Sequence, residues 1–163
     1  MADQTDFQPG TLLAALAAAR TRFYVIGGVM VQVYLPDQAT RDLDVLVEQD
    51  DRNLARIWEA LAPFHPRLLG ETEPPLLKEI GHRLFKGEVV QLETDAGLLD
   101  LFADVPGLGG YRQAKRAVRK LRLFGIAVEG LKAEALLETK VSVGRPKDRE
   151  VIRRLRAWLG RKP

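Results

Sequence analysis

The sequence predicts an α/β (α+β) fold in which a mixed β-sheet is flanked by α-helices. In the first part of the chain, short apolar segments alternate with segments of helical spacing. Further along, two apolar segments flank the turn Asp95-Ala96-Gly97, which is typical of a β-hairpin. Alternating strands and helices followed by a hairpin predict a sheet with both parallel and antiparallel strands.

The first elements begin after a polar segment. In chain order we expect a loose N-terminus (1–10), a helix capped by Thr11 (11–22), a strand (23–26), a tight turn at Gly27-Gly28 and a helix (29–35). The β-branched residues of 29–35 would also allow a strand. A helix is predicted because a pairing strand directly after the turn would leave the loop 36–39 no room to return.

The later elements are bounded by proline, glycine and capping residues. They are a strand (43–48), a helix after Asp50 and Asp51 (52–62), a short helix from Pro74 stopped by Gly81, hairpin strands (83–94 and 98–105), a basic helix (111–120), a strand pair or an extended segment around Gly125 (121–129), a helix ending at Gly144 (131–143) and a last helix from Pro146 to about Gly160.

Length and composition are those of an ordinary globular chain. With 163 residues, 46% hydrophobic and 29% charged, we expect a single domain over 1–163, with the helices of 131–160 packed on its core. The chain has no cysteine, which excludes disulfides and thiolate chemistry. Its first ten residues are polar and acidic, and the apolar stretch 12–19 is too short to span a bilayer. A cytoplasmic protein without a membrane partner is therefore expected.

Two acids lie at the start of the predicted strand 43–48, one directly before it and one inside it. Asp42 and Asp44 are separated by a single residue, so their side chains point to the same face of a strand. Two like charges at the start of an apolar strand are costly unless a positive charge lies between them. The alternative is a strand entry at which both carboxylates are simply solvated. A divalent cation is the simplest explanation of the pair.

A third acid, Asp100, stands alone inside the apolar segment 98–102. If this strand lies beside 43–48, Asp100 converges with Asp42 and Asp44; Asp104 is a rival on the same face, and a water-facing edge position is the alternative. Three converging carboxylates would hold one or two Mg²⁺ ions. Such sites catalyse phosphoryl or nucleotidyl transfer, in which the third carboxylate can also act as general base.

The diglycine turn offers a second kind of site. Backbone N–H groups of Gly27 and Gly28, at a turn that leads into a helix, attract phosphate oxygens. Alone, a Gly-Gly pair is more often only a tight turn. Its position before the acid pair favours a phosphate site.

The second half of the chain is basic. Six Lys or Arg and no acid lie between Arg112 and Arg122, and residues 144–163 are also rich in basic residues. Such basic segments could bind the phosphates of RNA or of a triphosphate, and Tyr111 is a candidate for stacking on a base. The alternative, and the more frequent case, is a basic face that is only solvated.

These residues resemble a known family. Ile26-Gly27-Gly28, thirteen intervening residues and Asp42-Leu43-Asp44-Val45 resemble the nucleotidyltransferase signature of the DNA polymerase β-like superfamily. The string 39–47 is similar to small bacterial minimal nucleotidyltransferases, including AbiEii-type toxins. Residues 137–148 resemble their Lys…Gly-Arg-x-Lys-Asp segment. The resemblance covers residues 23 to about 155.

The resemblance implies roles for eight residues and for Asp148 beside them. Gly27 and Gly28 would bind nucleotide phosphates, Asp42, Asp44 and Asp100 would bind Mg²⁺ and catalyse, Lys140, Arg145 and Lys147 would lie near the triphosphate, and Asp148 would position one of these cations. It also implies transfer of an NMP from ATP or another NTP to a hydroxyl of RNA or tRNA, a protein or a small molecule. A toxin activity with an antitoxin partner is a further implication.

The chain departs from the pattern in three ways. The second glycine position often carries a serine that touches a phosphate, whereas Gly28 has only backbone donors. Motifs of the antibiotic-modifying branch and dedicated acceptor domains are absent. The alternatives are a catalytically silent module that binds a nucleotide or partner, and a nuclease-like metal site. For Lys140, four residues after Leu136, the alternative is a solvated helix lysine.

Overall fold

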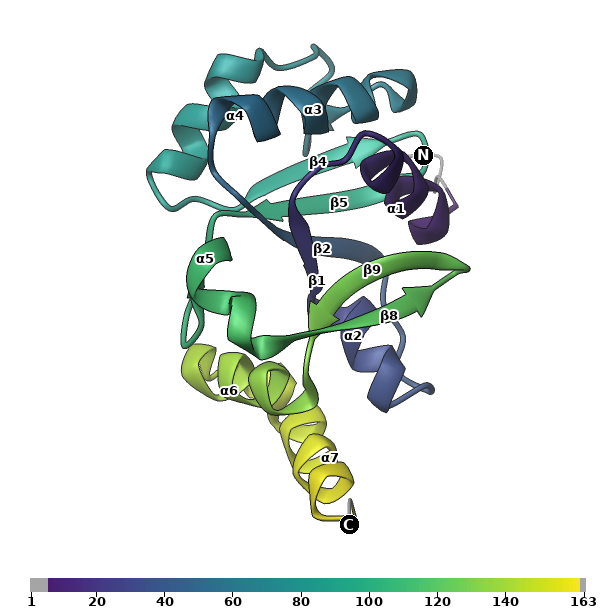
Figure 1. Ribbon diagram of the computed structural model, residues 1–163, viewed down its shortest axis with the longest axis vertical. Coiled ribbons are helices and arrows are strands. Elements are labelled where there is room, and N and C mark those ends of the chain that lie inside the picture. Colours follow the sequence, from purple (N-terminus) through teal and green to yellow (C-terminus); the bar gives the residue numbers. More distant parts are fainter. Residues whose placement is uncertain (1–5, 162–163) are drawn as a thin grey trace.

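The predicted α/β fold class is confirmed by the computed structural model, which describes residues 6–161. A seven-stranded mixed sheet has the strand order β3-β4-β5-β2-β1-β9-β8, and helices flank it (Figure 1). The strands of this sheet are β1 (Phe23–Ile26), β2 (Asp42–Val47), β3 (Arg67–Leu68), β4 (Val90–Thr94), β5 (Gly97–Phe102), β8 (Val118–Leu123) and β9 (Ile126–Leu131). A separate pair consists of β6 (Asp104–Val105) and β7 (Gly109–Gly110).

The helices lie in groups around the sheet. They are α1 (Pro9–Ala18), α2 (Gly27–Tyr34), α3 (Asp51–Leu61), α4 (Leu77–Phe85), α5 (Tyr111–Ala114), α6 (Ala133–Val143) and α7 (Arg149–Gly160), with short 3₁₀ turns at 62–64, 115–117 and 146–148. Helix α3 contacts α1 and α4, while α6 contacts α2 and α7. Figure 1 shows α3 and α4 at one end of the molecule and α7 at the other. None of the helices within 6–161 is long and apolar enough to cross a membrane.

The centre of the sheet is its most buried part. Strand β2 pairs antiparallel with β1 and parallel with β5, and β1 pairs parallel with β9. All four residues of β1 are buried, and so are the last three residues of β2. Burial on both faces explains why these strands are runs of apolar residues without alternation. The acids of β2 therefore enter the sheet at the edge of its core.

Most predicted elements are confirmed. The strand 23–26 and the helix that follows the glycines are observed, and Asp50 caps α3 by accepting a hydrogen bond from the N–H of Asn53 (2.7 Å). The predicted hairpin forms around Asp95-Ala96. Of the two alternatives for 121–129, the strand pair forms, around Phe124-Gly125. Helix α6 ends at Gly144, whose φ of 68° is the left-handed conformation that a helix C-terminus favours.

The predicted N-terminal boundary is wrong. The helix starts at Pro9, and Thr11 is not its cap, because a proline is pre-organised for the first helical turn. It ends at Ala18, shortly before Arg20 takes a φ of 55°, which no helix allows. Of the segment 1–10, predicted to be loose, residues 1–5 lie outside the described part of the chain.

Gly81 does not stop a helix as predicted. Helix α4 begins at Leu77 and runs through Gly81 to Phe85, so β4 starts only at Val90. Ile80 and Leu84, four residues apart, are both buried against the core. Burial of this apolar face outweighs the cost of about 1 kcal/mol for a glycine in a helix.

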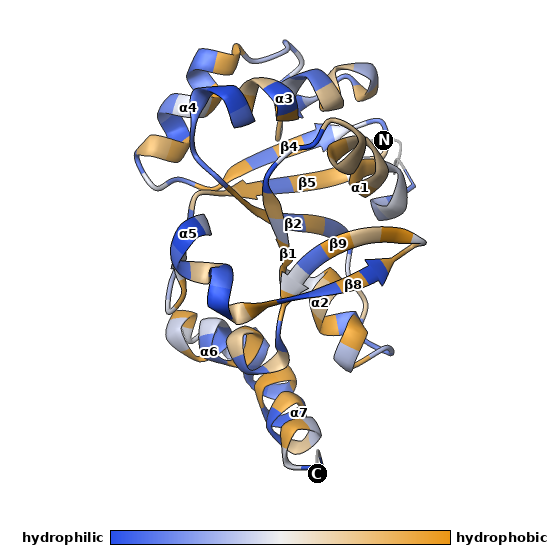
Figure 2. Cartoon of the chain, viewed as in Figure 1, coloured by the Kyte–Doolittle hydropathy of each residue, from blue (hydrophilic) through white to orange (hydrophobic). Residues whose placement is uncertain are grey.

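The predicted basic helix 111–120 is also shorter than expected. Only Tyr111–Ala114 is helical, and after one 3₁₀ turn the chain becomes strand β8 at Val118. Along β8, Val118, Leu121 and Leu123 pack against the core, and all six residues pair with β9. Three of the six basic residues, Arg119, Lys120 and Arg122, therefore lie on β8, the edge strand of the sheet, where they contribute hydrophilic blue in Figure 2. The other three precede this strand.

Candidate active site

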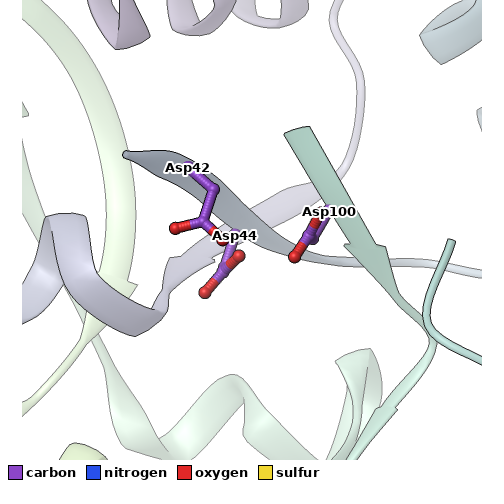
Figure 3. A group of neighbouring side chains, drawn as sticks. All are labelled: Asp42, Asp44 and Asp100. Atoms are coloured by element: carbon purple, nitrogen blue, oxygen red, sulfur yellow. The ribbon is translucent and has the colours of Figure 1, made fainter. Parts of the chain in front are cut away.

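The three predicted carboxylates converge. Asp44 of β2 lies opposite Asp100 in the parallel register of β2 and β5, and Asp42 precedes it on the same face. One carboxylate oxygen from each residue lies within 4.8 Å of the other two. Figure 3 shows the three side chains pointing to one side of the two strands. Asp104, the sequence-based rival, lies exposed on β6, outside this cluster.

The cluster is short of positive charge. Burial, and then the charges of Asp42 and Asp100, raise the pKa of Asp44 to about 8, with Lys140 acting in the opposite direction. Burial and Asp42 likewise raise the pKa of Asp100 to about 6. Among the residues described, Asp44 Oδ1 is the one buried side-chain oxygen or nitrogen without a hydrogen-bond partner. A bound cation would stabilise the ionised form of this buried carboxylate, which has two further acids beside it.

The donor set fits Mg²⁺. All three side chains offer carboxylate oxygens, the ligands that this hard cation prefers, and no histidine belongs to the group. It is also the one such cluster of potential metal ligands within 6–161. Asp42, Asp44 and Asp100 would therefore hold the ion.

Gly27 makes room for this cluster. It has a φ of 65°, and a Cβ atom there would lie 2.1 Å from Asp44 Oδ2. Only glycine satisfies both the left-handed backbone and the close approach of the carboxylate. Helix α2 starts at this residue, and no side chain caps its first turn. The N–H groups at its start are thus available to an anion.

Lys140 and Arg145 are brought together through Asp148. Lys140 Nζ lies 3.2 Å from Asp148 Oδ1, and Arg145 Nε lies 2.9 Å from Oδ2. Burial alone would raise the pKa of Asp148, but Lys140 and Arg145 hold it below its ordinary value. The Lys140 side chain is only 15% exposed, and its charge also acts on Asp44. Lys140 is therefore a largely buried cation that pairs with Asp148 and also acts on the acid cluster.

The two remaining candidates from the sequence are Lys147 and Tyr111. Lys147 is exposed and, in the part of the chain described, makes no ion pair. Tyr111 stacks on Tyr24, with ring centroids 4.2 Å apart and an interplanar angle of 10°. One face of the ring is thus covered by the sheet, which disfavours its predicted use as a platform for a nucleic-acid base.

Two polar neighbours of the site were missed in the sequence. Gln91 of β4 lies opposite Asp100, and its hydrogen bond lowers the pKa of that acid. The two-residue turn Asp95-Ala96 sets this register, so Gln91 was predictable from the hairpin. Thr40 is the second; its hydroxyl lies against Gly28, where a Cβ atom would be 2.4 Å from Oγ1. Nothing in the local sequence pattern pointed to that contact.

Comparisons with known proteins place the fold. No protein-family profile matches the chain, and no characterised protein matches it in sequence. Among solved structures, TM1012 of Thermotoga maritima, a candidate nucleotidyltransferase, has a TM-score of 0.57 at 14% identity, over 94% of this chain and 91% of that one. ANT(2″)-Ia in complex with adenylyl-2″-tobramycin has a TM-score of 0.60 at 15% identity, over 93% and 87%. The solution structure of this antibiotic-resistance factor gives 0.59 at 15% identity, over 93% and 82%.

At such low identity these likenesses establish the fold alone. The chain has the nucleotidyltransferase fold that its glycine and aspartate motifs resemble. The residues of the site, and not the fold, carry the evidence for an activity.

Proposed function

We propose that this chain is a Mg²⁺-dependent nucleotidyltransferase, which transfers an NMP from an NTP to an acceptor hydroxyl. The observation that carries the proposal is the convergence of Asp42, Asp44 and Asp100 beside the start of α2. Carboxylates that hold metal next to backbone donors that hold phosphate are the two parts that this reaction needs. The nucleotidyltransferase fold supports the same conclusion.

The residues divide into two groups around the triphosphate. Asp42, Asp44 and Asp100 would hold Mg²⁺, which when bound supplies positive charge to the phosphate oxygens and the attacking oxygen. On the other side, the N–H groups of Gly27 and Gly28 would donate hydrogen bonds to phosphate oxygens at the positive end of α2. Lys140 and Arg145, oriented by Asp148, would add cationic charge. Lys147 is exposed and remains the least supported member of the predicted set.

The chemical step is a displacement at the α-phosphorus. The acceptor oxygen forms a bond to this phosphorus, the bond between the α-phosphorus and the oxygen bridging to the β-phosphorus breaks, and pyrophosphate leaves. The proton of the acceptor hydroxyl passes to Asp100. A carboxylate at the metal site is a suitable general base for such a proton transfer.

The class of acceptor is the open part of the proposal. ANT(2″)-Ia is seen with an adenylylated small molecule, tobramycin, which is consistent with a small-molecule acceptor. The exposed basic residues Arg119, Lys120 and Arg122 on β8 favour instead a phosphate-rich acceptor such as RNA or tRNA. A toxin controlled by an antitoxin would belong with the second case.

Label transfer tests the proposal. The protein is incubated with Mg²⁺, each α-³²P-labelled NTP, and separate RNA, protein and small-molecule fractions of a lysate. We expect label in one fraction with wild-type protein and none with Asp44→Asn. Asp104→Asn, an exposed aspartate outside the cluster, is the matched control and should retain transfer. Cleavage of the RNA would indicate a nuclease, and NTP binding without any transfer would indicate a silent binding module.

A further inference from the structure

Thr40 excludes any side chain at Gly28. A Cβ atom at Gly28 would lie 2.4 Å from Thr40 Oγ1 and 2.9 Å from Thr40 Cβ. Unlike Gly27, Gly28 is not among the glycines with a positive φ, so its backbone would accept other residues. The glycine is therefore required by the threonine packed against it. A hydroxyl group occupies the space that a side chain at 28 would otherwise fill.

This hydroxyl lies where α2 begins. Thr40 is half-buried, two residues before Asp42, and its one hydrogen bond in the described structure is a long one, 3.2 Å, to the carbonyl oxygen of Asp42. Because Thr40 is β-branched and packed against Gly28, few χ1 rotamers are open to it. The hydroxyl hydrogen itself can rotate to a stronger acceptor. It is thus a positioned donor beside the uncapped N–H groups of the helix.

We propose that Thr40 Oγ1 donates a hydrogen bond to a phosphate oxygen of the nucleoside triphosphate, next to the backbone N–H of Gly28. The inference rests on the proposed function, since it assigns a further residue to the same phosphate site. Helix α2 directs its positive end there, and the acid cluster that would hold the metal adjoins it through Gly27. A bond from a hydroxyl to a charged phosphate oxygen is shorter and stronger than the present bond to a carbonyl. Phosphate binding would therefore draw the hydrogen away from Asp42.

Binding of inorganic tripolyphosphate and of each NTP, with Mg²⁺, tests the role of the hydroxyl. Thr40→Val keeps the shape and removes the donor, so we expect affinity to fall about tenfold, whereas Thr40→Ser should stay within about twofold of wild type. Thr21→Val is the matched control, because Thr21 also donates to a backbone carbonyl (2.8 Å, Leu16) but lies at the other end of β1. In transfer assays, Thr40→Val should raise KM and leave kcat nearly unchanged.

Moving the hydroxyl from residue 40 to residue 28 distinguishes loss of the hydrogen bond from misfolding. Gly28→Ser alone should lower the melting temperature because of the clash with Thr40. Combined with Thr40→Gly, the clash is removed, and the serine hydroxyl should restore tripolyphosphate binding relative to Gly28→Ala combined with Thr40→Gly. Equal affinity of these two folded double variants would overturn the inference.

Different results refute the role of Thr40 and the proposed function. Undiminished binding by Thr40→Val, with wild-type protein that binds NTP, refutes the role of Thr40 and leaves the proposed function in place. Wild-type protein that binds neither tripolyphosphate nor any NTP refutes the proposed function and, with it, the role of Thr40.

Discussion

Asp44 is the residue whose protonation depends most on a bound metal. Its pKa is raised to about 8, so at pH 7 the metal-free carboxyl is mostly protonated. A metal ligand must be deprotonated, so Mg²⁺ binding at pH 7 is expected to release about one proton. Calorimetric titration in two buffers of different ionisation enthalpy measures this number. Release should disappear at pH 9, where Asp44 is already ionised; proton uptake or no release at pH 7 would contradict the assignment.

The same carboxyl should make the metal-free protein less stable at high pH. The folded pKa of Asp44, about 8, lies above the ordinary value of 3.8, so the folded state holds the proton more tightly than the unfolded state. The free energy of unfolding therefore falls as pH rises from about 4 to 8. Asp44→Asn carries no such charge and should exceed wild type by more than about 1 kcal/mol at pH 8, and by little at pH 4.

Urea unfolding without divalent ions measures this difference. Saturating Mg²⁺ should reverse the order at pH 8, because only wild type then gains the binding energy. An Asp44→Asn variant that is less stable than wild type without metal would show that this carboxylate already has a stabilising partner.

At the scale of elements, the junction of β1 and α2 depends on Gly27. Gly27→Ala adds a Cβ atom at a φ of 65° and 2.1 Å from Asp44 Oδ2, and we expect a loss of about 3 kcal/mol in unfolding free energy, with weaker Mg²⁺ binding. Gly125→Ala is the control, because Gly125 has a φ of 79° with open space around it. That variant should lose only about 1 kcal/mol. Equal losses in the two variants would mean that the carboxylate does not depend on this close approach.

The link between α6 and α7 depends on Asp148. Asp148→Asn leaves the buried ammonium of Lys140 without its ion-pair partner, and we expect unfolding free energy to fall by about 2 kcal/mol and nucleotide affinity to drop. Because the pKa of Asp148 lies below its ordinary value, this stabilisation exists at neutral pH and is lost on acidification. Glu150→Gln, which removes an exposed pair with Arg153 at the same helix start, should have no measurable effect. Chemical denaturation of the three proteins compares them directly.

Elements with local signals were predictable, and those set by distant partners were not. The strand before the glycines, the hairpin turns and the end of α6 at Gly144 follow from local residue chemistry. By contrast, Gly81 lies inside α4 because the helix buries Ile80 and Leu84 in the core. Residues 118–120 are a strand because β9 offers a free edge. Tertiary contacts decide such segments against their local preference.

At the scale of the whole molecule, the site joins two parts of the chain. The glycines come from the start of α2, Thr40 from the loop after it and two acids from β2. The third acid and the cations come from β5, α6 and the turn before α7. The acids of the site were predictable from the sequence, because a carboxylate inside an apolar strand is costly unless a positive charge lies beside it. Their convergence required the parallel pairing of β2 with β5, which no local pattern determines. The contact of Thr40 with Gly28 likewise exists only in the folded chain.

The most direct test of the central claim compares two positions of the label in one NTP. With Mg²⁺ and the acceptor fraction, ³²P at the α-position should appear on the acceptor, and ³²P at the γ-position should appear in pyrophosphate. Asp44→Asn should abolish both products, and Asp104→Asn should not. Label from the γ-position on the acceptor, or acceptor labelling that persists in Asp44→Asn, would contradict nucleotidyl transfer at this carboxylate cluster.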